Sequence, residues 1–363
     1  MTLPDLVFIM LKNKKYPICL SLLLFIPGLS VFGQRDFLKN LSKVEYDTSY
    51  ISTYTTDYTC RLFGSVKYGQ TSYNDNLNGK SLYYKPNSKF LPGIGINHGF
   101  LGLNIAINLP FLNQDDDKYG ETKYYDLTAR VFSPRFNSTL YLQYYRGFYL
   151  SNTRDMVPGW EYGDPYYTRG DIRSVTAGLD LIYIFNSRKF SYRAAVIQNE
   201  WQKKSSGSFL GGGSIIYNAT FGDSSLVPSN LYYQSFYDGL KIDRSNNFSL
   251  GPAFGYAYTV VIKKHYFIMG SLNGSGTIGF TRFIIHENDE KVKSGVVFGL
   301  RSEILVSAGY NSEKWYFGLS FVNMSVTNQS PLDECTINYD TGMFRFNLAR
   351  RIPTKKPIRL LNS

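Results

Sequence analysis

Residues 292–310 read VKSGVVFGLRSEILVSAGY, and this stretch decides the fold. From Ser294 to Tyr310 every second residue is apolar or small, whereas the positions between them include Arg301 and Glu303. Because side chains alternate between the two faces of a strand, one face of this segment is largely apolar and the other is small, polar or charged. The run is much longer than the roughly 5–6 residues of an average strand. It predicts a long β-strand that is apolar on one side.

Two further alternating runs follow. Residues 315–321 read WYFGLSF and residues 344–348 read FRFNL, so large apolar side chains again occupy every second position. Long alternating strands with aromatic-rich apolar faces are what a transmembrane β-barrel requires. We therefore predict an all-β fold, an antiparallel transmembrane β-barrel in the outer membrane.

The composition agrees with this prediction. Aromatic residues make up 17% of the 363 residues, with 31 Tyr and 26 Phe. These residues suit pleated strands and the aromatic girdles of a barrel. The mean hydropathy is only −0.22, as expected when alternate residues alone face lipid. The net charge is +11, but basic residues are spread along the chain instead of gathering on one face, so we expect no nucleic-acid partner.

The N-terminal residues 1–33 have the pattern of an export signal. Lysines at positions 12, 14 and 15 precede a short apolar core, and Val31-Phe32-Gly33 supplies a cleavage site. A membrane anchor is the alternative, and translation from Met10 instead of Met1 is a second open point. We divide the chain into a signal peptide at 1–33, a periplasmic lead at 34–57, a transmembrane β-barrel at 58–351 and a basic C-terminal tail at 352–363.

About twelve strands are predicted in the barrel. They cover 58–68, 92–98, 101–109, 121–133, 136–149, 170–185, 208–221, 247–262, 266–280, 292–310, 315–321 and 344–348. Short turns then fall on the periplasmic side and longer loops outside, as in bacterial barrels. The segment 69–91 is interpreted as one of the outer loops. Cys60 opens the first predicted strand and Cys335 precedes the last one. We therefore expect them at opposite ends of the barrel, too far apart for a disulfide.

The segment 186–207 is the exception to this pattern. We interpret it as a short plug or cap, with an ordinary barrel strand as the alternative. If this segment and residues 79–86 were both barrel strands, the count would rise to fourteen.

The polar faces of the predicted strands carry charged residues that we expect to line the lumen. Cations outnumber anions among them, which favours a small anionic solute or a lipid headgroup as ligand. A network of salt bridges that merely fills the barrel is the alternative, and Asp126 and Asp180 are placed to share arginines. The candidate lumen-lining residues are Arg61, Lys67, Asp126, Arg130, Asp180, Arg301, Glu303 and Arg345.

No enzymatic chemistry is indicated. The three histidines are His98, His265 and His286, and none has a Ser or Cys nucleophile beside it in a catalytic pattern. We predict no catalytic residue, no metal site and no cofactor. A barrel lipid hydrolase is the least favoured function. A structural or partner-binding barrel that uses the Tyr-rich outer loops 150–169 and 222–246 ranks before it.

Several short motifs occur in a fixed order along the chain. They are YDTSYI at 46–51, Tyr84-x-Pro86-Asn87, Tyr119-Gly120-x-Thr122, QYYRGFY at 143–149 and RKFSYR at 188–193. With these motifs, residues 45–350 resemble an uncharacterised family of outer-membrane β-barrels, a domain of unknown function from Bacteroidota-type bacteria. The resemblance implies a barrel in contact with outer-membrane lipid. It implies no activity, substrate or protein partner, so no site residue is transferred.

Overall fold

The computed structural model describes residues 45–98, 101–228, 236–286, 290–332 and 334–354. The predicted export signal and most of the C-terminal tail lie outside these ranges. The long strands are β2 (Tyr58–Asp75), β7 (Phe136–Leu150), β8 (Thr168–Ile184), β10 (Ser206–Phe221), β11 (Ile242–Ile262), β12 (Tyr266–His286), β13 (Glu290–Asn311), β14 (Trp315–Gln329) and β15 (Cys335–Ile352).

The remaining elements are short. The strands are β1 (Ile51–Thr53), β3 (Lys80–Lys85), β4 (Phe90–His98), β5 (Leu101–Ala106), β6 (Lys123–Phe132) and β9 (Glu200–Gln202). The helices are η2 (Pro110–Leu112), α4 (Asp116–Tyr119), α5 (Thr153–Met156), α6 (Tyr192–Val196) and η3 (Phe236–Gly239). Within the described ranges, no helix has the length and apolar character needed to span a membrane.

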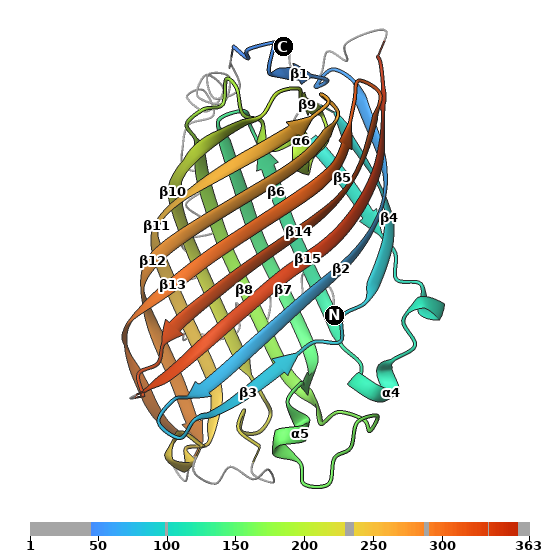
Figure 1. The fold of residues 1–363 in the computed structure, drawn as a ribbon. Helices are drawn as coiled ribbons and strands as arrows, with labels where there is room; N and C mark the ends of the chain where they lie inside the picture. The colour runs from blue at the N-terminus through green and yellow to red at the C-terminus, as the bar shows by residue number, and fades with distance from the viewer. Residues whose placement is uncertain (1–44, 99–100, 229–235, 287–289, 333, 355–363) are drawn as a thin grey trace, which may run out of the picture. The chain divides into compact units, whose positions relative to one another are not determined.

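Thirteen strands form one antiparallel sheet, and ten of them close into a barrel (Figure 1). β2 pairs with β15 on one side and β3 on the other, and β3 reaches β7 through Tyr84 and Lys85. The ring therefore runs β2, β3, β7, β8, β10, β11, β12, β13, β14 and β15 before returning to β2. β4 pairs with β2 beside β3, β5 pairs with β4, and β6 pairs with β7. The predicted antiparallel β-barrel is confirmed.

The strand count differs from the predicted twelve. The ring contains β3, which lies in the segment 69–91 that we interpret from the sequence as an outer loop. Its alternation is only six residues long and stops before Pro86, which cannot donate to a ladder. In contrast, β4, β5 and β6 match predicted strands but lie outside the ring of ten. The alternative of fourteen also fails, because residues 190–202 contribute no strand to the barrel sheet.

The predicted alternation of faces is confirmed in β13, which contains residues 292–310. On β13, Val296, Phe298 and Leu300 are 64–70% exposed, whereas Arg301 and Glu303 are 4% and 6% exposed. The apolar side chains therefore cover the outside of the barrel, and the charged ones turn inward. Large apolar side chains are exposed in the same way on every long strand of the ring.

One end of the barrel is closed by a polar cap, which we define as residues 46–54 and 186–203. Within it, β1 pairs with β9 and α6 lies between β8 and β9 in the chain. Tyr192 Oη donates to Ser271 Oγ at 2.9 Å, Tyr316 Oη donates to the Ala195 carbonyl at 3.0 Å, and Asn97 Nδ2 donates to the Ile197 carbonyl at 2.7 Å. The prediction that 186–207 forms a short plug or cap is confirmed.

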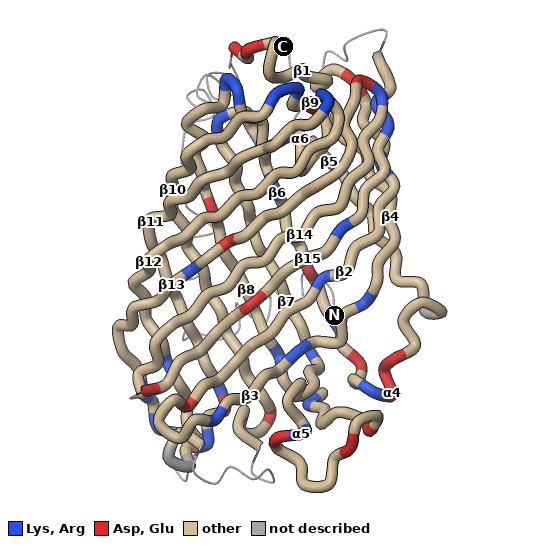
Figure 2. The backbone as a smooth tube through the Cα atoms, viewed as in Figure 1, with Lys and Arg blue, Asp and Glu red and all other residues tan. Residues whose placement is uncertain are grey.

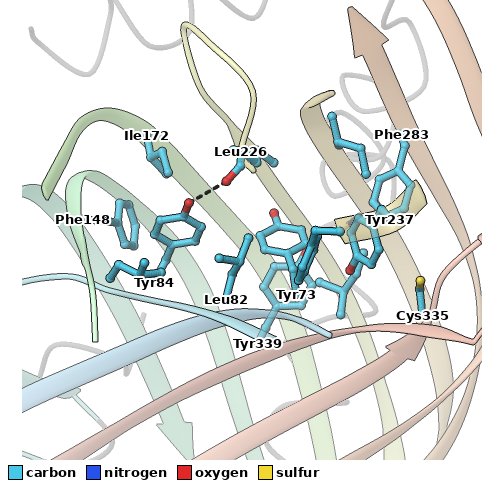
Figure 3. Close-up of a cluster of buried hydrophobic side chains, with 14 of the residues drawn as sticks. Tyr73, Leu82, Tyr84, Phe148, Ile172, Leu226, Tyr237, Phe283, Cys335 and Tyr339 are labelled. Carbon is cyan, nitrogen blue, oxygen red and sulfur yellow. Dashed lines mark hydrogen bonds between the residues drawn. The ribbon is translucent and has the colours of Figure 1, made fainter. Parts of the chain in front are cut away.

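The opposite end is filled by apolar side chains, which we call the aromatic layer (Figure 3). Its members come from strands all around the ring and from the loop that folds in between β10 and β11. Tyr84 Oη donates to the Leu226 carbonyl at 2.6 Å and so ties that loop to β3. The layer includes Tyr73, Leu82, Tyr84, Phe148, Ile172, Leu226, Tyr237, Phe283 and Tyr339.

The two cysteines of the barrel lie at opposite ends, as predicted. Cys60 is opposite Arg350 near the cap, whereas Cys335 is opposite Asp75 near the aromatic layer. They form no disulfide with each other.

Candidate functional site in the barrel interior

Charged residues gather at both ends of the barrel, and few lie along the middle of the strands (Figure 2). The eight residues that we predict from the sequence to line the lumen all lie on strands of the sheet. Their contacts divide them into two groups in which a cation is paired with carboxylates and one group that has no carboxylate partner.

The first group is Arg301, Asp180 and Glu303. Arg301 Nη2 donates to Asp180 Oδ2 at 2.5 Å and to Glu303 Oε2 at 3.2 Å. Asp180 lies on β8 and Arg301 on β13, which are separated by three strands of the sheet, so this contact crosses the barrel interior. All three side chains are buried. One cation between two carboxylates holds opposite walls together, and it leaves one carboxylate charge that Arg301 alone does not balance.

The second group is the pair Lys67 and Asp126. Lys67 Nζ lies 2.9 Å from Asp126 Oδ1. The same carboxylate accepts hydrogen bonds from Gln143 Nε2 at 3.0 Å and from Tyr145 Oη at 2.7 Å. The expectation that Asp126 and Asp180 share arginines is therefore wrong, because Asp126 is paired with a lysine.

The third group, which we call the arginine cluster, is Arg61, Arg130 and Arg345. Within the described residues, none of the three has a carboxylate within 4.0 Å. Arg61 is 4% exposed, and its Nε and Nη2 atoms have no hydrogen-bond acceptor. Arg345 Nε also has none, and its guanidinium lies 4.6 Å from the Phe63 ring centroid.

The members of the arginine cluster act on one another. Arg61 and Arg130 are close enough to Arg345 for their charges to repel it, and the positive charge of Arg130 also acts on Asp180. A buried charge without a partner is costly, and like charges brought together add to that cost. Such a cluster favours the binding of an anion.

A network in the cap was missed from the sequence. Arg351 donates to the Gln198 carbonyl at 2.7 Å, to the Glu200 carbonyl at 3.0 Å, to Asn311 Oδ1 at 2.8 Å and to the Ser312 carbonyl. The partners lie far apart in sequence and follow no strand period, so nothing in the local pattern indicates them. The network fixes the cap to the ends of β13 and β15.

Glu200 anchors the other side of the cap. It forms an ion pair with Arg193 at 3.3 Å and accepts a hydrogen bond from Tyr46 Oη at 2.8 Å. Burial, reinforced by the negative charge of Glu200, raises the pKa of Tyr46 well above its ordinary value, so this phenol stays protonated as the donor. The motif residues at 46–51 and 188–193 therefore meet in space as parts of the cap.

The described histidines are packed as aromatic rings. His98 stacks on Tyr58 with 4.6 Å between ring centroids, and His265 stacks on Trp201 at 5.0 Å. The His286 side chain lies outside the described residues. In the part of the chain that the structure describes, no three His, Cys, Asp or Glu side chains form a group able to hold a metal ion.

Solved structures with a similar fold are β-barrels of the outer membrane. The outer membrane protease OmpT from Escherichia coli has 10% identity and a TM-score of 0.38, with 83% of this chain and 98% of that chain covered. A Pseudomonas aeruginosa FadL homologue has 8% identity and a TM-score of 0.24, with 82% and 90% covered. The Pseudomonas putida toluene transporter TodX has 9% identity and a TM-score of 0.24, with 85% and 94% covered. At these scores we draw no conclusion about function from them.

Sequence comparison identifies the family. No curated protein matches the chain. Residues 45–351 match the model of a family described as a domain of unknown function (DUF4421), and the chain belongs to that family.

Proposed function

For this member of the DUF4421 family, we propose an outer-membrane β-barrel that binds a small anionic group inside its lumen. The membrane location is supported by the belt of exposed apolar side chains around the ring, such as Phe298 at 64% and Leu300 at 70%. Leaving such a belt in water costs about 25 cal/mol per Å² of apolar surface. The predicted export signal at 1–33 and periplasmic lead at 34–57 provide the route to that membrane, and the basic tail at 352–363 follows the last strand.

The observation that supports an anionic ligand is the arginine cluster. Lys67 and Arg301 are paired with carboxylates, as the filled-barrel alternative expects, but Arg61 and Arg345 keep buried donors without acceptors. A phosphate or carboxylate would supply those acceptors, and Arg is the side chain best suited to bind either group through two parallel hydrogen bonds.

Binding is favoured over free axial passage. The polar cap closes one end of the interior and the aromatic layer closes the other. An open porin keeps a water-filled channel instead. The cluster is therefore a site inside a barrel that is closed at both axial ends, and not a filter in an open pore.

The test is the binding of inorganic phosphate to the refolded full chain in a zwitterionic detergent. At constant ionic strength, replacing chloride by phosphate raises the Tm of the wild type, since a ligand that binds only the folded state stabilises it. The triple variant R61Q/R130Q/R345Q loses this rise. The control R154Q/R188Q/R350Q removes the same number of positive charges outside the cluster. It retains the rise in Tm on exchange of chloride for phosphate. An equal rise in both variants, or none in the wild type, contradicts the proposal.

A partner-binding role for the outer loops has one observation in its favour. Tyr166 packs against Tyr119, Tyr149 and Trp160 with ring centroids 5.1–5.3 Å apart, and Tyr162 beside them is 95% exposed. Exposed aromatic residues are common in recognition surfaces. They also suit the membrane interface, so this function ranks second.

A further inference from the structure

In the described part of the chain, the ring is closed between β2 and β7 only by the short β3, and the flanking strands β5 and β6 leave a break in the wall because they do not pair with each other. Among the described residues, β5 pairs only with β4 and β6 pairs only with β7, so each has one edge without a ladder. The only strand that links β2 to β7 among the described residues is the short β3. This link lies at the end of the barrel near the aromatic layer. The break therefore lies toward the cap, beside β4 and β5.

β5 also departs from the alternation seen in the closed wall. Its outward residues Leu103 and Ile105 are 62% and 52% exposed, and its inward residue Asn104 is exposed as well. On β13 the inward residues from Val297 to Ser307 are buried, except the half-buried Gly299. The inner face of β5 is thus accessible at the break.

Both edges of the break have apolar outer faces. Leu103 and Ile105 on β5 and Leu127 and Val131 on β6 are all more than half exposed. In a bilayer these side chains contact acyl chains. The unpaired edges of the same strands are polar, and hydrocarbon does not tolerate unpaired backbone groups. An occupant of the break therefore needs an apolar part outside and a polar part inside.

The arginine cluster lies directly inside this break. A Cβ on Gly95 of β4 would lie 3.3 Å from Arg61 Nε and 2.3 Å from Asn104 Oδ1, so the Arg61 side chain reaches over β4 toward β5. Arg130 is on β6 itself, at the other edge. Arg345 lies next to Arg61 around the ring, over the Phe63 ring. The two sides of the break thus each bring an arginine to it.

We propose that the break between β5 and β6 is a lateral portal for an anionic membrane lipid. Its phosphate headgroup binds Arg61, Arg130 and Arg345 in the lumen, while its acyl chains stay outside against Leu103, Ile105 and Leu127. Since both axial ends are closed, the side of the barrel is the route that needs no movement of the cap or the aromatic layer. This inference rests on the proposed anion site and adds the ligand class and its entry path.

The experiment places a fluorescent probe on Asn104→Cys in a C19S/C60S/C335S background of the full chain, which removes all three native cysteines. The protein is reconstituted in phosphatidylcholine vesicles that contain either brominated phosphatidylglycerol or brominated phosphatidylcholine as quencher. We expect quenching at position 104 by the anionic lipid and not by the zwitterionic one. The added R61Q/R130Q/R345Q substitutions weaken it by about tenfold or more, as expected when charge-assisted hydrogen bonds are lost.

The matched control is Leu272→Cys on the outward face of the closed wall, where the native side chain is 57% exposed. Both brominated lipids quench a probe there equally, with or without the arginines. Equal quenching by both lipids at position 104, or none, overturns the portal. So does a disulfide between two copies through Asn104→Cys, because a second chain would then cover the edge.

Free phosphate distinguishes the two proposals. If inorganic phosphate stabilises the wild type through the arginine cluster but the anionic lipid does not quench position 104, the anion site stands and the lipid portal is wrong. If the R61Q/R130Q/R345Q substitutions change neither the rise in Tm with phosphate nor the quenching by the anionic lipid, both proposals are wrong.

Discussion

Both ends of the barrel contain apolar packing, since Phe190, Tyr192 and Ala195 of the cap join an apolar cluster with barrel residues, but the polar contacts of the two ends differ. At the cap, main-chain carbonyls of residues 195–200 accept hydrogen bonds from Tyr316, Asn97 and Arg351 of the barrel. At the other end, the aromatic layer packs apolar side chains from the strands against an inward-folded loop, with few polar contacts such as that from Tyr84 to Leu226.

This difference reflects what each closing segment offers. The cap contains one short helix and two three-residue strands, so many of its backbone groups lack partners within regular structure. These groups must be satisfied by side chains of the barrel. The aromatic layer offers apolar area instead, and its stability grows with the area removed from water. The stability of the cap should therefore depend on individual hydrogen-bond donors, and the stability of the aromatic layer on the buried apolar volume.

The largest effect is expected in the aromatic layer, from Tyr84→Ala. Tyr84 is completely buried, and removal of a buried aromatic ring costs about 3–5 kcal/mol because a cavity is left. Unfolding by urea in detergent micelles measures the change. The control Tyr84→Phe keeps the ring and removes only the hydrogen bond to Leu226, at about 1 kcal/mol. Equal losses in the two variants would mean that the hydrogen bond, and not volume, stabilises this end.

Arg351→Met should have a somewhat smaller effect at the cap. It removes one side chain that donates to four acceptors in and beside the cap, and stranded buried acceptors cost about 3 kcal/mol in total. Limited proteolysis should cut the cap before the barrel unfolds. The neighbouring Arg350→Met is the control, since Arg350 is exposed and lies over Trp315 at 5.2 Å, a contact worth about 0.5–1 kcal/mol. Similar losses in both variants would contradict the role of the cap network.

The smallest effect concerns conduction. Deletion of residues 187–206 removes most of the cap, and the ends of β8 and β10 are near enough to rejoin, because Ile184 pairs with Leu210. We expect no steady single-channel current in a planar bilayer from either the full chain or this variant, because the aromatic layer still closes the other end. A steady current after the deletion would show that the cap alone seals the barrel.

The fold class could be predicted from local pattern because a strand has period two. The run at 292–310 contains enough alternating residues to assign a face to each side chain, and the exposures of Phe298 and Arg301 agree with it. The segment 186–207 could be separated from the strands by loop length and not by its local pattern, because short turns fall on the periplasmic side only if this segment is one connection. β3 was missed because six residues are too few to distinguish a strand from a polar loop.

The sequence by itself determined which residues are strand-forming, which of their faces is apolar, and where the short turns lie. Tertiary structure alone decided how the ring closes and how the interior charges are shared. The partners in each contact, such as Arg301 with Asp180 or Lys67 with Asp126, lie on strands far apart in the chain. Local periodicity fixes only the face of each residue. The position around and along the barrel, which leaves Arg61, Arg130 and Arg345 without carboxylates, follows from register and ring closure.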